Sequence, residues 1–257
     1  MERIKIFLKK FFSNKLNIIT IVGTLLVVVI VLMVLFSNNK NNGFLFVNSD
    51  DEKKFKNEYE SLNGEVAPDS SNKYPEVKLP TSNLIKYSTI EEVLKIFNND
   101  EDAVIYFGYS TCLYCRNAIQ VLVDTAVNTE LDEMLYIDIE DYWDVLTLDN
   151  NGKVVTEKKS HDKYYELLDV LGDELITDYI LKDENGNDVK TGVKRIQYPL
   201  VIFVTDGRVV SYNIGTLFSQ ENPFVSMDDS QIRGLSEIYR YGIRDVVVSK
   251  KNKGLLK

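Results

Sequence analysis

Two cysteines three positions apart are the residues of this sequence best suited to chemistry. They are the only cysteines among 257 residues and stand in the run Cys112-Leu113-Tyr114-Cys115. One such pair excludes a framework of several disulfides, and it indicates either a redox pair or half of a metal site. Because the chain has a single histidine and no further cysteine, a tetrahedral zinc site is not expected, and we assign no metal ligands.

The position of the pair gives the two sulfurs different roles. A continuous apolar run at 103–109 is typical of a central buried strand, and a helical pattern follows at about 115–127. The sulfur of Cys112 then lies over the unpaired N–H groups of the helix start, which stabilise a thiolate. Cys115 lies one turn further on and faces inward. We therefore expect Cys112 to be the nucleophile and Cys115 to resolve the mixed disulfide.

The surrounding pattern predicts an α/β domain with a central mixed sheet. A strand is expected at 134–140, and the order strand, helix, strand predicts a parallel βαβ unit. Strands at 200–204 and 209–212 flank Asp206-Gly207, which suits a tight hairpin turn, so this pair is predicted to be antiparallel.

Two helices are expected to flank the sheet outside the βαβ unit. Ser88 and Glu91 have capping-box spacing and predict a helix that ends near residue 97. A last helix is expected to begin after caps at 228–230 and to end near residue 246. Its predicted inward side chains are Ile232, Leu235, Ile238 and Tyr239.

The segment 142–197 is predicted to be an insertion between the two halves of the domain. Turn residues at 150–152 and at 185–186 each predict a hairpin, and a helix at 160–171 is expected to end at Gly172.

The remaining parts of the chain are assigned by composition. Residues 16–36 carry no charge, and about 20 apolar residues suffice to cross a bilayer, so they predict a transmembrane signal anchor. Basic residues dominate 1–15, which predicts a cytoplasmic N-terminal tail and an extracytoplasmic C-terminal domain. Residues 37–80 are polar and are predicted to be a stalk. The domain is expected over 81–248, and 249–257 is a basic C-terminal tail.

Charge and motifs also limit the partners. The net charge is −9, which disfavours nucleic acid and anionic lipid as ligands. The sequence has no nucleotide- or flavin-binding motif, so no cofactor is expected and redox equivalents must come from another protein.

This arrangement resembles the thioredoxin superfamily, in which a strand, a C-x-x-C helix and a second strand precede a cis-proline that opens a β-hairpin. Tyr198-Pro199 matches that proline. A closer similarity is to Gram-positive membrane-anchored thioredoxin-like proteins that include bacteriocin transport accessory proteins. It is carried by 105–109, by 112–118 and by the insertion before Pro199. The resemblance implies a thioredoxin-like fold and extracytoplasmic thiol–disulfide exchange with protein substrates and a membrane or extracytoplasmic redox partner.

The resemblance also implies a substrate site around the pair. The backbone at Tyr198, before Pro199, is expected to pair with an extended substrate, and Tyr109 and Tyr114 are candidates for an aromatic wall. Arg116 would add positive field at the thiolates, although we expect it to be a solvated residue on the helix face.

Two positions depart from thioredoxin itself. Tyr106 stands where thioredoxins have a buried Asp, so the usual proton acceptor for the resolving cysteine is missing. Leu113-Tyr114 replaces the Gly-Pro between the cysteines, which leaves the redox direction open.

Two other classes of function remain open at this point. The pair would bind copper(I) through two soft thiolates, or the domain would be a redox-inert adaptor of a secretion or bacteriocin export system with a structural disulfide. A reactive low-pKa Cys112 favours the oxidoreductase, an unreactive disulfide favours the adaptor, and stoichiometric copper retention favours the metal carrier.

Overall fold

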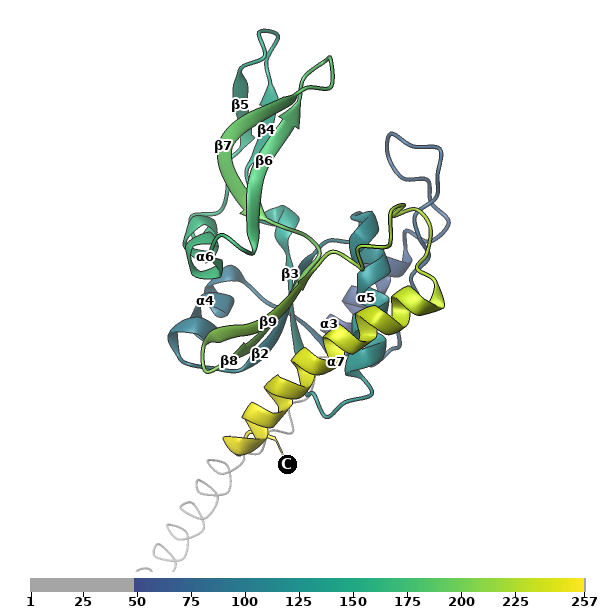
Figure 1. Ribbon diagram of the computed structural model, residues 1–257, viewed down its shortest axis with the longest axis vertical. Helices are drawn as coiled ribbons and strands as arrows, with labels where there is room; N and C mark the ends of the chain where they lie inside the picture. Colours follow the sequence, from purple (N-terminus) through teal and green to yellow (C-terminus); the bar gives the residue numbers. More distant parts are fainter. Residues whose placement is uncertain (1–48, 257) are drawn as a thin grey trace, which may run out of the picture. The chain divides into compact units, whose positions relative to one another are not determined.

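A five-stranded mixed sheet forms the centre of the fold in the computed structural model, which describes residues 49–256 (Figure 1). The strands lie in the order β1-β3-β2-β8-β9. Their bounds are β1 Ile85–Tyr87, β2 Ala103–Gly108, β3 Met134–Asp138, β8 Leu200–Thr205 and β9 Arg208–Ile214. β1 and β2 run parallel to β3, whereas β8 is antiparallel to β2 and to β9. This mixed α/β architecture is compatible with a thioredoxin-like fold.

The two central motifs predicted from the sequence are present. β2 leads through α5, Leu113–Ala126, into β3, and the two strands pair in parallel with Tyr106 beside Tyr136. β8 and β9 form the predicted hairpin, and Asp206 and Gly207 both adopt positive φ at its turn. β1 was not predicted, because three residues are too few to show a period.

Helices cover both faces of the sheet because the side chains of β2 alternate (Figure 1). Val104 and Tyr106 face a core formed with α3, Ser49–Glu60, with α5 and with α7, Asp229–Asn252. Ile105 and Phe107 face a second core formed with α4, Ile90–Asn98, and α6, Tyr164–Leu171. Every residue of β2 is buried, so this strand is fixed from both sides.

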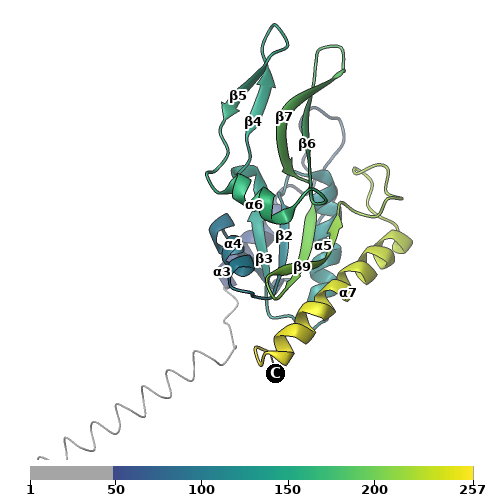
Figure 2. The same ribbon diagram turned by 60° about the vertical axis from the view of Figure 1, so that its left-hand side comes forward.

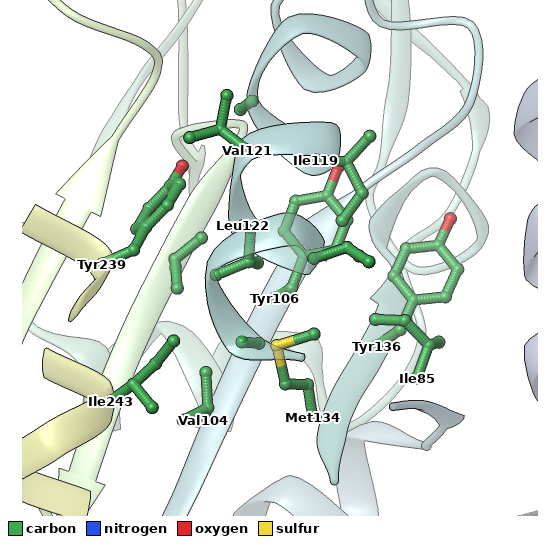
Figure 3. Close-up of a cluster of buried hydrophobic side chains, with 14 of the residues drawn as sticks. Ile85, Val104, Tyr106, Ile119, Val121, Leu122, Met134, Tyr136, Tyr239 and Ile243 are labelled. Atoms are coloured by element: carbon green, nitrogen blue, oxygen red, sulfur yellow. The ribbon is translucent and has the colours of Figure 1, made fainter. Parts of the chain in front are cut away.

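The first of these cores holds α5 against the sheet. Figure 3 shows Ile119 and Leu122 of α5 beside Val104 and Tyr106, with Tyr239 and Ile243 of α7 closing the cluster. Burying each large apolar side chain contributes roughly 1.5–3 kcal/mol. The start of α5, where the cysteines lie, is therefore anchored to the centre of the domain.

The insertion forms two hairpins and a short helix, as its turn residues predicted. β4, Val145–Leu148, pairs with β5, Val154–Lys158, and β6, Ile176–Lys182, pairs with β7, Asp188–Ile196. The two hairpins extend side by side away from the central sheet in both views (Figures 1 and 2). The helix, α6, begins at Tyr164 rather than at residue 160, and Gly172 ends it with a positive φ.

Two details of the flanking helices differ from prediction. The capping box of α4 is formed by Thr89 and Glu92, one residue later than predicted, because Thr89 Oγ1 accepts from the Glu92 N–H. Asp228 caps α7 as expected, but Ile232 and Ile238 are 40% and 36% exposed. The buried stripe of α7 consists of Leu235, Tyr239, Gly242, Ile243, Val246, Val247 and Lys250.

The first four residues of the predicted basic tail at 249–257 are helical, since α7 continues to Asn252. Lys250 pairs with Asp132 at 2.6 Å, and Lys253 pairs with Asp102 and Asp206 at 2.6 and 2.7 Å. Cations near a helix C-terminus also interact favourably with its dipole. The last turn of α7 is therefore tied to the domain by its own charges.

The predicted stalk is wrong for residues 49–80, which belong to the domain. α3 lies within the expected stalk and contributes Phe55 and Tyr59, both fully buried, to the first core. Val77 and Leu79 are also buried there, so residues 49–80 belong to the same compact unit as the sheet. The polar composition of this segment predicted a stalk, but about one apolar side chain per turn, here Phe55 and Tyr59, is enough to dock the helix.

The predicted cytoplasmic tail, 1–15, and the transmembrane helix, 16–36, lie outside the described residues, as does the stalk before residue 49. Within 49–256, no helix combines the length and the apolar character that crossing a membrane requires.

Candidate active site

The two cysteines form a disulfide at the start of α5. Cys112 is the N-cap residue, and its Sγ accepts a hydrogen bond of 3.1 Å from the backbone N–H of Cys115. The two Cα atoms are 5.1 Å apart. Cys112 is 7% exposed, whereas Cys115 is fully buried.

This geometry distinguishes the two sulfurs chemically. A thiolate at Cys112 lies where the helix presents unpaired N–H groups and the positive end of its dipole, both of which stabilise the anion. Cys115 has no access to solvent, so an external disulfide reaches only Cys112. The arrangement is compatible with thiol–disulfide exchange in which the first sulfur attacks.

Arg116, which follows the second cysteine, is buried rather than solvated, and the prediction of a surface residue is wrong. Its side chain is 1% exposed. Nε donates to the carbonyl of Pro75 at 2.8 Å, and Nη1 donates to the carbonyls of Tyr59 at 2.7 Å and Ser110 at 3.2 Å. Pro75 and Tyr59 lie in the chain before residue 80, which had been assigned to the stalk, whereas Ser110 lies in the loop before Cys112.

The charge of Arg116 has no carboxylate partner in the part of the chain that the structure describes. Nη2 donates to Asn63 Oδ1 at 2.8 Å, and the guanidinium lies 5.3 Å from the centre of the Tyr74 ring. Burial lowers the pKa of this guanidinium, yet arginine stays protonated in proteins. An unneutralised positive charge is therefore held at the first turn of α5, bonded to the carbonyl of Ser110.

Tyr106, at the position that the resemblance to thioredoxins equates with a buried Asp, lies fully buried in the first core. Its hydroxyl is 2.8 Å from the hydroxyl of Tyr59, and its ring stacks on Tyr136 with centroids 5.5 Å apart. Burial raises the pKa of both Tyr59 and Tyr106, so the pair remains neutral. Gly108 accommodates it, because a Cβ there would lie 2.3 Å from the Tyr106 hydroxyl.

Pro199 lies at the same end of the sheet as the segment that leads to Cys112. The Tyr198–Pro199 peptide bond is cis, as the resemblance implied. Leu200 pairs with Phe107 near the end of β2, because β8 runs antiparallel to β2. The start of β8 is therefore adjacent in the sheet to the strand end from which the cysteine loop departs.

The structure brings Tyr109 and Tyr198 together but places Tyr114 elsewhere. The rings of Tyr109 and Tyr198 lie 5.1 Å apart, and each contacts Trp143, at 5.4 and 5.2 Å. Burial and hydrogen bonding with Tyr198 raise the pKa of Tyr109. The Tyr114 hydroxyl instead lies 3.5 Å from the carbonyl of Glu221, in the segment before α7.

Two residues beside Tyr109 and Tyr198, Trp143 and Arg195, were not predicted from the sequence. Trp143 is the only tryptophan of the chain, and its position at the start of the insertion was the one available signal. Arg195 lies close to three aromatic rings, including that of Tyr198. It stands three residues before Tyr198 in the sequence, but this position indicates a contact only once the course of β7 is known. Tyr109, Trp143 and Tyr198 are called the aromatic cluster below.

Comparison of the sequence with protein-family models and with curated proteins finds no match. The functional assignment therefore rests on the mixed sheet and on the geometry of the Cys112–Cys115 pair. Across residues 49–256, no group of three or more His, Cys, Asp or Glu side chains comes together in a way that would hold a metal ion.

Proposed function

We propose that this protein is a thioredoxin-like thiol–disulfide oxidoreductase that works by exchange at Cys112 and Cys115. The observation that carries the proposal is the placement of Cys112 as the N-cap of α5, with the buried Cys115 bonded to it one turn away. The position of Pro199, at the start of β8 beside the end of β2, supports the same function.

The exchange proceeds in two displacements. In the reducing direction, the thiolate of Cys112 attacks one sulfur of a substrate disulfide, which forms a mixed disulfide and releases one substrate thiolate. Cys115 then loses its proton and attacks the Cys112 sulfur, which releases the second substrate thiolate and leaves the enzyme disulfide. The substrate gains two electrons and two protons. The oxidising direction is the reverse, and a second redox protein restores the starting state.

Arg116 tunes this chemistry through its charge. A carboxylate-free guanidinium at the first turn of α5 adds to the helix dipole and favours the thiolate of Cys112 over the thiol. Tyr106 adds no negative charge beneath the strand, since it is neutral. Both features favour a pair that is easily reduced and therefore oxidising.

The substrate is an extended protein segment that carries a thiol or a disulfide. The backbone at Tyr198, before Pro199, pairs with it, and Tyr109 and Tyr114 contact it. The apolar segment at 16–36 anchors the protein in the cell membrane with this domain outside the cytoplasm, where a membrane or extracytoplasmic partner exchanges electrons with it.

The reduction potential tests the proposal. The full-length protein in mild detergent is equilibrated in thiol–disulfide buffers of graded potential, and free thiols are trapped and counted by mass. Cys112→Ser is the control. We expect reversible two-electron behaviour between roughly −270 mV, typical of a reductant, and roughly −120 mV, typical of a strong oxidant. A disulfide that stays oxidised in strong reductant, or never exchanges, would exclude catalysis and favour the adaptor.

A further inference from the structure

Arg195 of β7 carries a positive charge that the described residues leave unpaired. It forms no ion pair, although Lys194 beside it pairs with Asp173. The Nε atom of Arg195 is buried and has no hydrogen-bond acceptor. The described residues therefore leave the Arg195 side chain incompletely hydrogen-bonded, and burying a donor without an acceptor costs free energy.

Aromatic rings surround this guanidinium instead of carboxylates. Its central carbon lies 4.2 Å from the ring centre of Tyr179, 5.4 Å from that of Tyr198 and 5.7 Å from that of Trp143. Rings bind a guanidinium through its face. The terminal Nη N–H groups lie in its plane and point outward from its edge. Because Arg195 is half-buried, these groups remain available to a carboxylate, whereas Nε is enclosed by the protein.

The position of Arg195 connects it to the exchange site. Tyr198 is both a neighbour of the guanidinium and the residue before the cis-proline. Tyr198 contacts Tyr109, and the carbonyl of Tyr109 accepts a hydrogen bond of 3.3 Å from the backbone N–H of Cys112. One continuous set of contacts therefore runs from the disulfide through the aromatic cluster to Arg195.

We propose that Arg195 and the aromatic cluster form a subsite for a carboxylate of an extended peptide that docks beside the cysteine pair. The inference rests on the proposed function, because it assigns a specificity to the same site. Two N–H groups at the Nη edge of Arg195 would bind both carboxylate oxygens, while the rings of Trp143 and Tyr198 exclude water from the ion pair. Segments with an acidic residue near their cysteine are then the preferred substrates.

Trp143 provides a direct readout of this subsite, since it is the only tryptophan of the chain. The full-length oxidised protein in mild detergent is titrated with capped heptapeptides that lack Trp and Tyr, and Trp143 emission is recorded. Each peptide has Ser in place of its central Cys and Glu at one position on either side of it, and each is matched by a Gln peptide. One further peptide offers only a free C-terminal carboxylate.

Three variants separate charge from structure. Arg195→Met removes the charge, Arg195→Lys keeps it without the planar fork, and Arg233→Met removes an exposed charge from α7 on the opposite face of the sheet. Binding of the Gln peptides reports any general damage that a variant causes at the peptide site. If Arg195→Met does not fold, the ratio of Glu to Gln affinity of the unaltered protein at low and at high salt decides.

We expect at least one Glu peptide, or the free C-terminus, to bind about tenfold more tightly than its neutral match, as a partly desolvated ion pair allows. Arg195→Met should abolish this ratio and leave Gln binding unchanged, Arg195→Lys should keep part of it, and Arg233→Met should keep all of it. The subsite is overturned if the two peptides of every matched pair bind with equal affinity or do not bind at all. It is also overturned if the ratio of Glu to Gln affinity persists in Arg195→Met or in high salt.

The readout also separates the subsite from the proposed function, because Ser peptides cannot exchange. A tenfold ratio in a protein whose disulfide never exchanges would leave the subsite standing and exclude catalysis. Normal exchange without any charge preference would exclude the subsite alone.

Discussion

Nη1 of Arg116 donates a hydrogen bond of 2.7 Å to the carbonyl oxygen of Tyr59, which lies 57 residues earlier in the chain. The bond joins the first turn of the cysteine helix α5 to the end of α3. With the bond to Pro75, it makes the segment before residue 80 part of the support of the candidate site. Replacing Arg116 therefore tests both the fold and the chemistry.

Arg116→Met should lower the free energy of unfolding by about 2–4 kcal/mol, because three carbonyl groups and one amide lose their donor in a buried site. Chemical denaturation measures this change. The pKa of Cys112, followed by the pH dependence of its alkylation, should rise, because a positive charge at the first turn of α5 is lost.

Arg240→Met is the matched control, since Arg240 is exposed on α7 and bonds only to Glu237. It should change stability by less than about 0.5 kcal/mol and leave the pKa of Cys112 unchanged. An Arg116→Met protein with a normal Cys112 pKa would show that Arg116 is a structural clamp without an electrostatic role.

The Tyr59–Tyr106 pair should behave as one unit. Tyr106→Phe strands the buried Tyr59 hydroxyl and should cost about 1–3 kcal/mol, and Tyr59→Phe should cost a similar amount. The double variant should cost less than the sum, because both polar groups then leave together. Urea unfolding of the four proteins gives the coupling energy, and strictly additive losses would rule out a hydrogen-bonded pair.

Truncation should separate the domain from the segment before it. Deletion of residues 1–45 should leave a protein that unfolds cooperatively, because it keeps all of residues 49–256, which form one compact unit. Deletion of residues 1–80 should abolish cooperative unfolding. It removes four side chains of the first core, each worth about 2–5 kcal/mol, from a total stability of about 5–15 kcal/mol. These are Phe55, Tyr59, Val77 and Leu79. Thermal unfolding followed by circular dichroism distinguishes the two truncated proteins. A sharp transition in the protein that lacks residues 1–80 would show that this segment is a stalk outside the domain.

The stability should depend on pH through Asp138. Burial, together with Glu58 and Asp141, raises the pKa of this carboxyl to about 7, against about 3.9 in the unfolded chain. Between these values the folded protein holds a proton that the unfolded chain has lost, so this contribution to stability is present below pH 4 and is lost as the pH rises to 7.

Asp138→Asn should remove that loss. Asn keeps an acceptor for the Glu140 N–H, and the variant should gain about 2 kcal/mol relative to the parent between pH 4 and pH 8, after allowance for partial solvent screening. Denaturation at a series of pH values gives the difference. A difference that does not vary with pH would mean that the Asp138 carboxyl titrates normally.

Local patterns predicted the elements whose sequences carry a period or a turn signature. A continuous apolar run predicted β2, and the spacing of apolar residues along one face predicted α5. Asp206-Gly207 predicted the β8–β9 hairpin. The insertion hairpins followed from their own turn residues. These features depend on neighbours in sequence, which is why the chain alone was enough.

The remaining features depend on contacts between distant segments. Arg116 reads as a surface helix residue, and only the carbonyls of Tyr59 and Pro75 explain its burial. The docking of α3 rests on a few apolar side chains in a polar segment, and the surroundings of Arg195 come from three separate parts of the chain. The periodicity of a sequence does not indicate contacts between segments that are far apart in the chain.

The most direct test of the central claim compares Cys115→Ser with Cys112→Ser in their reaction with glutathione disulfide, with adducts identified by mass. Cys112 is the sulfur at the helix start, and Cys115 is fully buried. Cys115→Ser should therefore form one glutathione adduct on Cys112 at least about 100-fold faster than Cys112→Ser forms one on Cys115. Equal rates, or no adduct on Cys112, would contradict thiol–disulfide exchange initiated by Cys112.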